Sequence, residues 1–217
     1  MRASLVAAHP SIAPHLDARA GAQRARLLEG MTQAVAEKGY ADATVADAVR
    51  GARVSRGTFY AEFASKEECF LEAYRHGVEV LEQRIDAAVR IPAGDWRERL
   101  RAGLRAYLDC LAEEPAFART WLLEIHAAGP AAQAARDATL WRFAERYRAS
   151  FEASGAPRLP SGDALFVLAA GVDQLVCARL RAGALDDLDG LTDTLLTCAV
   201  AQLAGTAAHE QGDPGWT

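Results

Sequence analysis

Residues 44–66 read TVADAVRGARVSRGTFYAEFASK, and this stretch decides the fold that we expect for the N-terminal part of the chain. It predicts two short helices, at 44–50 and 55–63, joined by a tight turn. Thr44 opens the first helix with a capping-box pattern in which Asp47 takes the position usually held by Glu. Two short helices with such a turn make a helix-turn-helix, whose second helix can enter the major groove of DNA.

The apolar and polar side chains of this stretch are expected on opposite faces. The residues that pack the two helices together are Val45, Val49, Val54, Phe59 and Phe63. The residues of the second helix that face DNA are then Ser55, Arg56, Thr58 and Tyr60. Gly57 has no side chain, so a phosphate backbone can approach it closely. Thr44 and Lys66 lie at helix N-termini, where free N–H groups can hold a phosphate.

Several of these residues also have a plainer interpretation. Thr44 caps a helix whether or not it contacts a phosphate. Arg56 could be a solvated surface cation, although its place at the start of the second helix favours DNA. Tyr60 could be half-buried in the core, and Lys66 could simply be an exposed residue at the start of the next helix.

The stretch resembles the DNA-binding signature of the tetracycline-repressor (TetR) family of bacterial regulators. The residues that match the signature are Thr44, Val45, Ala52, Val54, Ser55, Gly57, Thr58, Phe59, Tyr60, Phe63, Ser65, Lys66 and Glu67. A helix at 22–38 followed by Gly39 and Tyr40 also agrees with the family pattern, so the resemblance covers about residues 22–75. It implies a transcription repressor that a small molecule releases from a palindromic operator.

Three positions depart from the signature. Ala48 stands where the family usually has Ile, which makes the local core smaller. Arg53 stands where the family usually has Gly; if the turn keeps a left-handed backbone, a non-Gly residue costs about 1 kcal/mol, and we expect Arg53 to offset this cost by touching a phosphate. Glu62 should repel phosphate, so we expect it to point away from DNA or to accept from a cytosine amino group.

The rest of the chain predicts an all-α protein, because Ala, Leu, Arg and Glu are abundant and favour helices. Ser65 opens a long helix with a capping box to Glu68. Helical spacing predicts that this helix spans 65–90 and that others span 95–114, 115–128, 131–154, 162–184 and 188–205. We therefore expect a flexible extension at 1–21, a DNA-binding domain at 22–68, a larger ligand-binding and dimerisation domain at 69–207, and a disordered tail at 208–217.

Aromatic and embedded polar residues of the larger domain are candidates for lining an effector cavity, which the resemblance implies. They are Trp121, Glu124, His126, Trp141, Phe143, Tyr147, Asp173 and Gln174. Aromatic residues at helical spacing are more often core, and Glu124 could instead pair with Arg119 or Arg146. The helices at 162–184 and 188–205 carry wide apolar stripes, and by the resemblance they form a homodimer interface. Two recognition helices would then read two half-sites.

The charge distribution limits how the chain can bind DNA. The net charge is −5, and residues 1–75 carry ten Lys and Arg against nine Asp and Glu. The N-terminal part is therefore not a basic arm, and DNA binding must use a few placed cations. We expect a shallow dependence of affinity on salt.

Other functional classes find little support in the sequence. Four separated cysteines (Cys69, Cys110, Cys177 and Cys198) are expected to be small buried hydrophobes in a reducing cytosol, and their spacing predicts no metal site. No cofactor or nucleophile motif appears, so we expect no enzyme. No apolar run reaches the ~18–20 residues of a membrane span, and a cytoplasmic location is expected. A regulator controlled by a protein partner, or an activator, remains an alternative.

Overall fold

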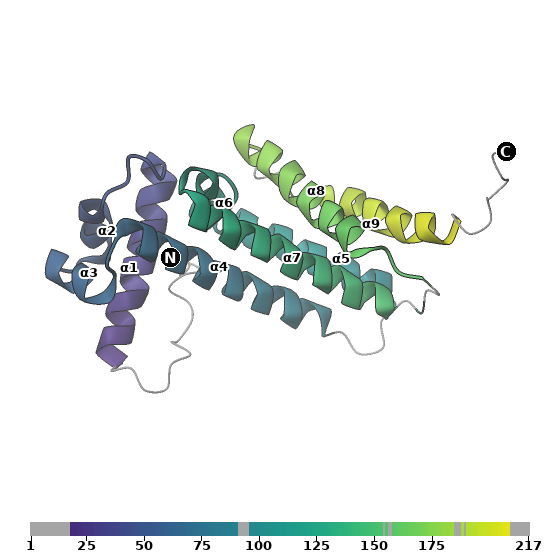
Figure 1. Ribbon diagram of the computed structural model, residues 1–217, viewed down its shortest axis with the longest axis horizontal. Coiled ribbons are helices and arrows are strands. Elements are labelled where there is room, and N and C mark those ends of the chain that lie inside the picture. The colour runs from purple at the N-terminus through teal and green to yellow at the C-terminus, as the bar shows by residue number, and fades with distance from the viewer. Residues whose placement is uncertain are drawn as a thin grey trace. The chain divides into compact units, whose positions relative to one another are not determined.

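The computed structural model describes residues 18–90, 96–153, 155, 158–184, 188 and 190–208. In these ranges the protein is built from nine α-helices and one 3₁₀ helix, with no strand, as the sequence predicts (Figure 1). The elements are α1 (Ala18–Lys38), α2 (Val45–Ala52), α3 (Arg56–Glu62), α4 (Lys66–Val89), α5 (Trp96–Glu113), α6 (Pro115–Leu122), η1 (Glu124–Ala127), α7 (Pro130–Glu152), α8 (Gly162–Arg181) and α9 (Leu191–Ala208).

Most helices start and end within a few residues of the predicted positions, but three differences matter. Helix α1 begins at Ala18, so residues 18–21 are helical and do not belong to a flexible extension. The segment predicted as one helix at 115–128 is divided into α6 and η1. Helix α9 continues to Ala208. The rest of the predicted extension and tail, at 1–17 and 209–217, lies outside the described residues.

The helices pack into two compact units, and the division differs from the predicted boundary after residue 68. The first unit contains residues 1–83 and 111–136, and the second contains 84–110 and 137–217. Residues 111–136 join the first unit because α6 packs on α1. Thr120 Oγ1 of α6 donates a hydrogen bond to the backbone oxygen of Thr32 in α1, at 3.1 Å.

The first unit encloses the core that supports the helix-turn-helix (Figure 1). Its fully buried side chains include Leu27, Met31, Val35, Ala48, Phe59, Phe63 and Phe70. Helices α1 and α2 approach so closely that a Cβ at Gly30 would lie 2.5 Å from the backbone oxygen of Ala48. The absence of a side chain at Gly30 therefore permits this contact, where a Cβ would press the two helices apart.

The second unit has a separate core. Its buried residues include Leu104, Leu108, Ala144, Phe151, Leu165, Val176 and Leu195. Helices α8 and α9 lie against each other, and Gln202 of α9 donates to the backbone oxygen of Ala164 in α8. Ion pairs join Arg101 to Asp193 and Arg146 to Asp86.

Two whole-chain expectations can be compared with the described residues. Cys69, Cys110 and Cys177 are buried, as expected, but Cys198 is exposed on α9, so that part of the prediction is wrong. A membrane-crossing helix would need a longer and more apolar stretch than any of the described helices contains.

Candidate nucleic-acid interface

Helix α2 begins with the capping box that the sequence predicts. The Thr44 hydroxyl accepts a hydrogen bond from the backbone N–H of Asp47 at 3.2 Å. The Asp47 carboxylate accepts from the backbone N–H of Thr44 at 3.0 Å and from its hydroxyl at 2.7 Å. The reciprocal bonds satisfy N–H groups that the first helical turn leaves unpaired, and they fix the start of the helix-turn-helix.

The Asp47 carboxylate also accepts hydrogen bonds from two cationic side chains. Lys38 Nζ at the end of α1 lies 2.6 Å from its Oδ1, and Arg50 of α2 donates to the same oxygen. The hydrogen bond from Lys38, then those from Thr44 and Arg50, outweigh burial and hold the pKa of Asp47 well below its usual range. Asp47 therefore stays ionised and ties the end of α1 to the start of α2.

The turn between α2 and α3 has the left-handed backbone that was considered from the sequence. Arg53 has φ 53° and ψ 45°, the region that favours glycine. Arg53 N–H bonds to the carbonyl of Arg50, and Val54 N–H bonds to that of Val49. The Arg53 side chain is exposed and available to a phosphate.

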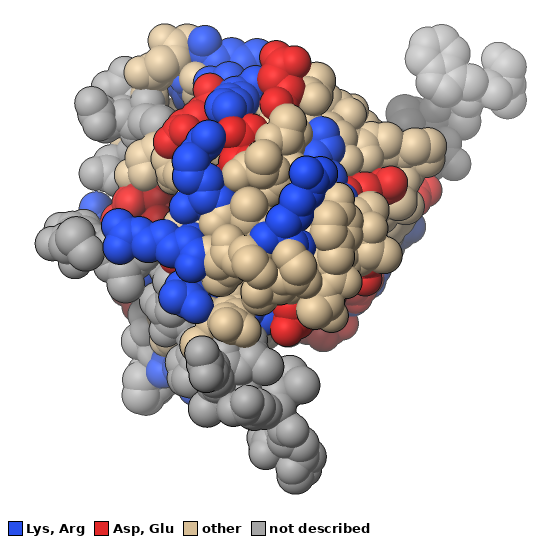
Figure 2. All heavy atoms as spheres, turned by 90° about the vertical axis from the view of Figure 1, so that its left-hand side faces the viewer, with Lys and Arg blue, Asp and Glu red and all other residues tan. Residues whose placement is uncertain are grey.

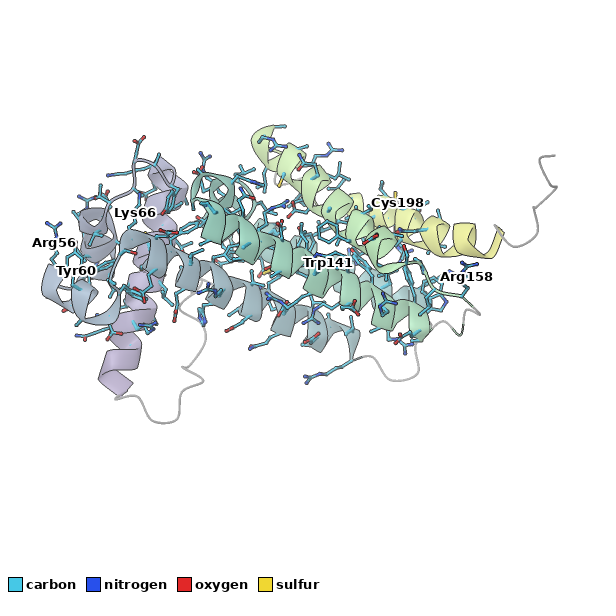
Figure 3. All side chains as sticks on the ribbon, in the orientation of Figure 1. Arg56, Tyr60, Lys66, Trp141, Arg158 and Cys198 are labelled. Atoms are coloured by element: carbon cyan, nitrogen blue, oxygen red, sulfur yellow. The ribbon has the colours of Figure 1, made fainter. Side chains whose placement is uncertain are left out.

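Helix α3 has one buried face and one open face. Ser55 caps it by accepting from the Thr58 N–H at 3.0 Å, and the two hydroxyls are 2.9 Å apart. Phe59 is fully buried, whereas Arg56 and Gly57 are exposed and Tyr60 is 51% exposed. Figure 3 shows Arg56 and Tyr60 projecting from α3, with the guanidinium of Arg56 5.9 Å from the Tyr60 ring centre.

Lys66 at the start of α4 has a structural role that the sequence did not reveal. Its Nζ donates to the backbone oxygens of Tyr40 at 2.7 Å and Ala43 at 3.1 Å, and it lies 4.2 Å from the Tyr40 ring centre. The preceding cap differs slightly from the prediction: Ser65 accepts from the Glu68 N–H, but the Glu68 carboxylate accepts from Ala64 and not from Ser65. A phosphate bound by Lys66 would share its ammonium with these carbonyls.

Glu62, the acidic residue of α3, is held by Arg24, which the sequence analysis did not single out. Arg24 of α1 donates to the Glu62 carboxylate and to its backbone oxygen, each at 3.1 Å. Burial alone would lower the pKa of Arg24, but the hydrogen bonds and charges of Glu72 and Glu62 together raise it. No short motif signals this contact, because 38 residues separate Arg24 from Glu62.

The α1–α3 end of the molecule faces the viewer in Figure 2. Lys and Arg side chains are distributed over this face with uncharged and acidic side chains between them. Such a face holds placed cations and not a continuous basic field, as the charge count predicts.

Three of the predicted effector contacts, Trp121, Glu124 and His126, belong to the first unit. In the first unit, Trp121 is buried and stacks on Phe117 with the ring centres 5.6 Å apart. Glu124 lies 3.5 Å from Arg119, one of its two expected partners, and it also accepts from the backbone N–H of Tyr40 at 2.9 Å. His126 is exposed, and its backbone oxygen accepts from Gln133.

The other predicted effector contacts lie in the second unit. Phe143 lies 6.1 Å from the buried Tyr107, measured between ring centres. Burial, then the charges of the buried Asp173 and of neighbouring residues including Tyr147, raise the pKa of Tyr107. Phe143 contacts Tyr107, a residue absent from the predicted effector contacts, and the charges of Asp173 and Tyr147 act on it. The remaining two candidates, Trp141 (labelled in Figure 3) and Gln174, are exposed.

Within the part of the chain that the structure describes, no group of three or more His, Cys, Asp or Glu side chains could hold a metal ion.

Comparison with known proteins finds a family model that matches the N-terminal part of the chain and solved structures that share its fold. Residues 27–73 match the model described as bacterial regulatory proteins, tetR family. The chain is similar in structure to the fatty acid degradation regulator FadR from Bacillus halodurans, at 19% identity and TM-score 0.72, over 82% of this chain and 94% of that one. The transcriptional regulator FadR from Bacillus subtilis, solved in complex with stearoyl-CoA, gives 16% identity and TM-score 0.71 over 82% and 97%.

A transcriptional regulator from Rhodococcus sp. RHA1 is similar at 23% identity and TM-score 0.70, over 84% of this chain and 96% of that one. No curated protein sequence matches the chain. At these identities the solved structures show that this chain shares their fold, over nearly the whole length of each of those chains.

Proposed function

We propose that the chain is a homodimeric repressor of the tetracycline-repressor type, because residues 27–73 match the model described as bacterial regulatory proteins, tetR family. It binds a palindromic DNA operator and leaves it when an apolar small molecule binds. The observation that carries the DNA-binding part is the open face of α3. Ser55, Arg56, Gly57 and Tyr60 are exposed there, while Phe59 anchors the opposite face in the core.

The contacts to DNA follow from the position of each group. Arg56 stands in the first turn of α3, where a recognition helix meets base edges, and arginine pairs with guanine there. Phosphates are bound by hydroxyls or cations, and Gly57 lets the DNA backbone approach closely. The residues that supply these groups are Thr44, Arg53, Ser55, Thr58, Tyr60 and Lys66. One short helix reads few base pairs, so specific binding needs two copies on two half-sites.

Helices α8 and α9 supply the proposed dimer interface. Between Val167 and Ala178 the exposed positions of α8 follow helical spacing and are small or apolar apart from Gln174: Val167, Gly171, Gln174 and Ala178. The other exposed residues of α8, near its two ends, are the charged Asp163, Arg179 and Arg181. Val167 is 67% exposed, and with Gly171 and Ala178 it forms an uncharged face along α8 that a second copy could cover. On α9 the corresponding exposed residues are Thr194, Cys198 and Ala201. Close packing against a second copy would bury this face and explain the exposed cysteine.

We propose that the effector is a long-chain acyl thioester. FadR from Bacillus subtilis was solved with stearoyl-CoA, and this chain has a similar fold. We propose that Phe143, Tyr147 and Asp173 around Tyr107 contact the ligand. Because a buried carboxylate disfavours a neighbouring anion, we expect the acyl chain, and not the phosphates of CoA, to lie beside Asp173.

The connection from effector to DNA runs through α6 and η1. Helices α5 and α7 each have residues in both units and flank residues 111–136. Within the first unit, α6 and η1 contact α1 and the turn before α2 through Thr120 and Glu124. A ligand that changes the position of α5 or α7 would therefore strain these contacts. It shifts the operator equilibrium only by its different affinities for the two conformations.

Selection from random duplex DNA tests the operator part. Purified wild-type protein is compared with a Tyr60→Ala, Arg56→Ala double variant of equal stability. We expect wild type alone to enrich a palindrome. If folded, dimeric wild type enriches no sequence, the repressor proposal is wrong.

Titration of the selected complex with stearoyl-CoA tests the effector part, with free CoA as the control for the anionic head group. We expect stearoyl-CoA to release DNA and free CoA to leave it bound. Release by neither compound would exclude acyl thioesters as effectors while leaving the operator result intact.

A further inference from the structure

Arg24 occupies the point where three helices of the first unit meet. Its Nη1 donates to the backbone oxygen and the carboxylate of Glu62, at the end of α3. Its Nε and Nη2 donate to the Glu72 carboxylate of α4, at 3.2 and 2.7 Å. The guanidinium also lies over the Phe63 ring, 4.4 Å from its centre. One side chain of α1 therefore holds α3 and α4 together.

We propose that Arg24 is a positioning residue for DNA recognition, which fixes the angle of α3 and cancels the charge of Glu62. The inference rests on the proposed function, because it assigns a role in operator binding. Arg24 lies ahead of the 27–73 stretch that matches the family model, so the family pattern does not assign it.

The need for such a residue follows from the size of α3. The helix has seven residues, and Phe59 is the buried side chain within it. Phe63, the cap residue that follows the helix, is also buried, so apolar packing holds one face of α3, and small changes in the angle of a recognition helix displace base contacts. Arg24 adds a polar fixed point at the same end, where the backbone oxygen of Glu62 carries part of the negative helix dipole.

The second effect is electrostatic. Glu62 is an acidic residue on the helix that we assign to DNA, and a free carboxylate there would repel phosphate. Arg24 is paired with it at 3.1 Å, with both side chains less than a third exposed. Lysine cannot replace Arg24, because one ammonium lacks the planar fork that reaches Glu62 and Glu72 together.

Four variants assayed on the selected operator separate this role from general stability. Arg24→Gln is compared with Arg26→Gln, an exposed arginine on the same helix, which removes the same charge. We expect Arg24→Gln to weaken operator binding about tenfold more than Arg26→Gln, as expected for lost charge-assisted hydrogen bonds. Equal losses would overturn the proposal. Arg24→Lys, which keeps the charge, is expected to remain weakened, and wild-type binding by this variant would also overturn it.

The effect of Glu62→Gln on operator binding distinguishes a positioning role of Arg24 from a purely stabilising ion pair. A pair that only stabilises the fold would weaken binding equally when either partner is changed. We instead expect Glu62→Gln to bind within about twofold of wild type, because Arg24 keeps its bonds to the Glu62 backbone and to Glu72. If Glu62→Gln weakens binding as much as Arg24→Gln, Arg24 has no positioning role. Failure of wild type to select any operator would instead contradict the proposed function.

Discussion

Glu124 of η1 accepts a hydrogen bond at 2.9 Å from the backbone amide of Tyr40, 84 residues earlier in the chain. The neighbouring Gly39 has φ 80°, and a Cβ there would lie 3.2 Å from the same carboxylate oxygen. On the other side, Lys66 holds the carbonyls of Tyr40 and Ala43. The turn between α1 and α2 is thus bracketed by two charged side chains.

Removal of the Glu124 carboxylate should loosen this turn. We expect Glu124→Ala to lower the free energy of unfolding by about 1–3 kcal/mol, the usual effect of leaving a partner of a charged hydrogen bond unpaired. Hydrogen exchange at the Tyr40 amide should become faster. Glu37→Ala, which changes an exposed carboxylate on α1, is the control. Unchanged exchange at Tyr40 in Glu124→Ala would show that the contact does not hold the turn.

Arg53 should show opposite effects on stability and on DNA binding. Arg53→Gly relieves a left-handed backbone, so we expect the free energy of unfolding to rise by about 1 kcal/mol. It also removes a cation, so operator affinity should fall roughly two- to fivefold. Arg53→Ala is the control, because it loses the cation without relieving the backbone. Thermal unfolding and DNA titration measure the two effects, and a loss of stability in Arg53→Gly would contradict the backbone argument.

Asp47 should make stability depend on acid. Its pKa lies below the ordinary value of 3.8 in the folded chain, so the unfolded chain binds a proton first as the pH falls. The stabilisation is complete above about pH 4 and decreases as the pH falls below that value. We expect Asp47→Asn to be less stable at pH 7 and to lose less stability on acidification. Asp42→Asn, an exposed carboxylate in the turn before α2, is the control for chemical unfolding at pH 7, 4 and 3.

A curve for Asp47→Asn that falls below pH 4 as steeply as the wild-type curve would show that the carboxylate gains nothing from its partners. The comparison is independent of DNA, so it tests the local structure of the helix-turn-helix by itself.

Val167 tests the dimer interface. A carboxylate placed at this exposed position would be buried without a partner if a second copy covers α8. We expect Val167→Glu to raise the dimer dissociation constant on the order of tenfold or more, with the monomer still folded. Sedimentation of Val167→Glu and of Ala131→Glu, an exposed control on α7, measures the change. Identical dimers in both variants would place the interface elsewhere.

Local chemistry in the sequence predicted the helix-turn-helix closely. The cap formed by Thr44 and Asp47, the left-handed turn at Arg53 and the buried Phe59 each depend on residues a few positions apart, so spacing alone could reveal them. The hydrogen bonds of Arg24 and Lys66, and the one between Glu124 and Tyr40, could not be found in this way. They join residues that are 23 to 84 positions apart, and only the packing of whole helices brings these together.

The effector candidates show the same limit. Polar residues in apolar helices were selected by type, but helix rotation decides which of them are covered. Asp173 is buried and Gln174, the next residue, is exposed on the same helix. For a related reason the packing of α6 on α1 could not be predicted, since it leaves no mark in either sequence segment.

The most direct test of the account is a titration of the selected operator as a full palindrome and as a single half-site. The account predicts two chains on the palindrome and an affinity for the half-site about a hundredfold weaker or more, because the second contact is then lost. Tyr60→Ala should reduce binding to both. If one half-site binds as tightly as the palindrome, or if Tyr60→Ala binds like wild type, a pair of α3 helices does not read the operator.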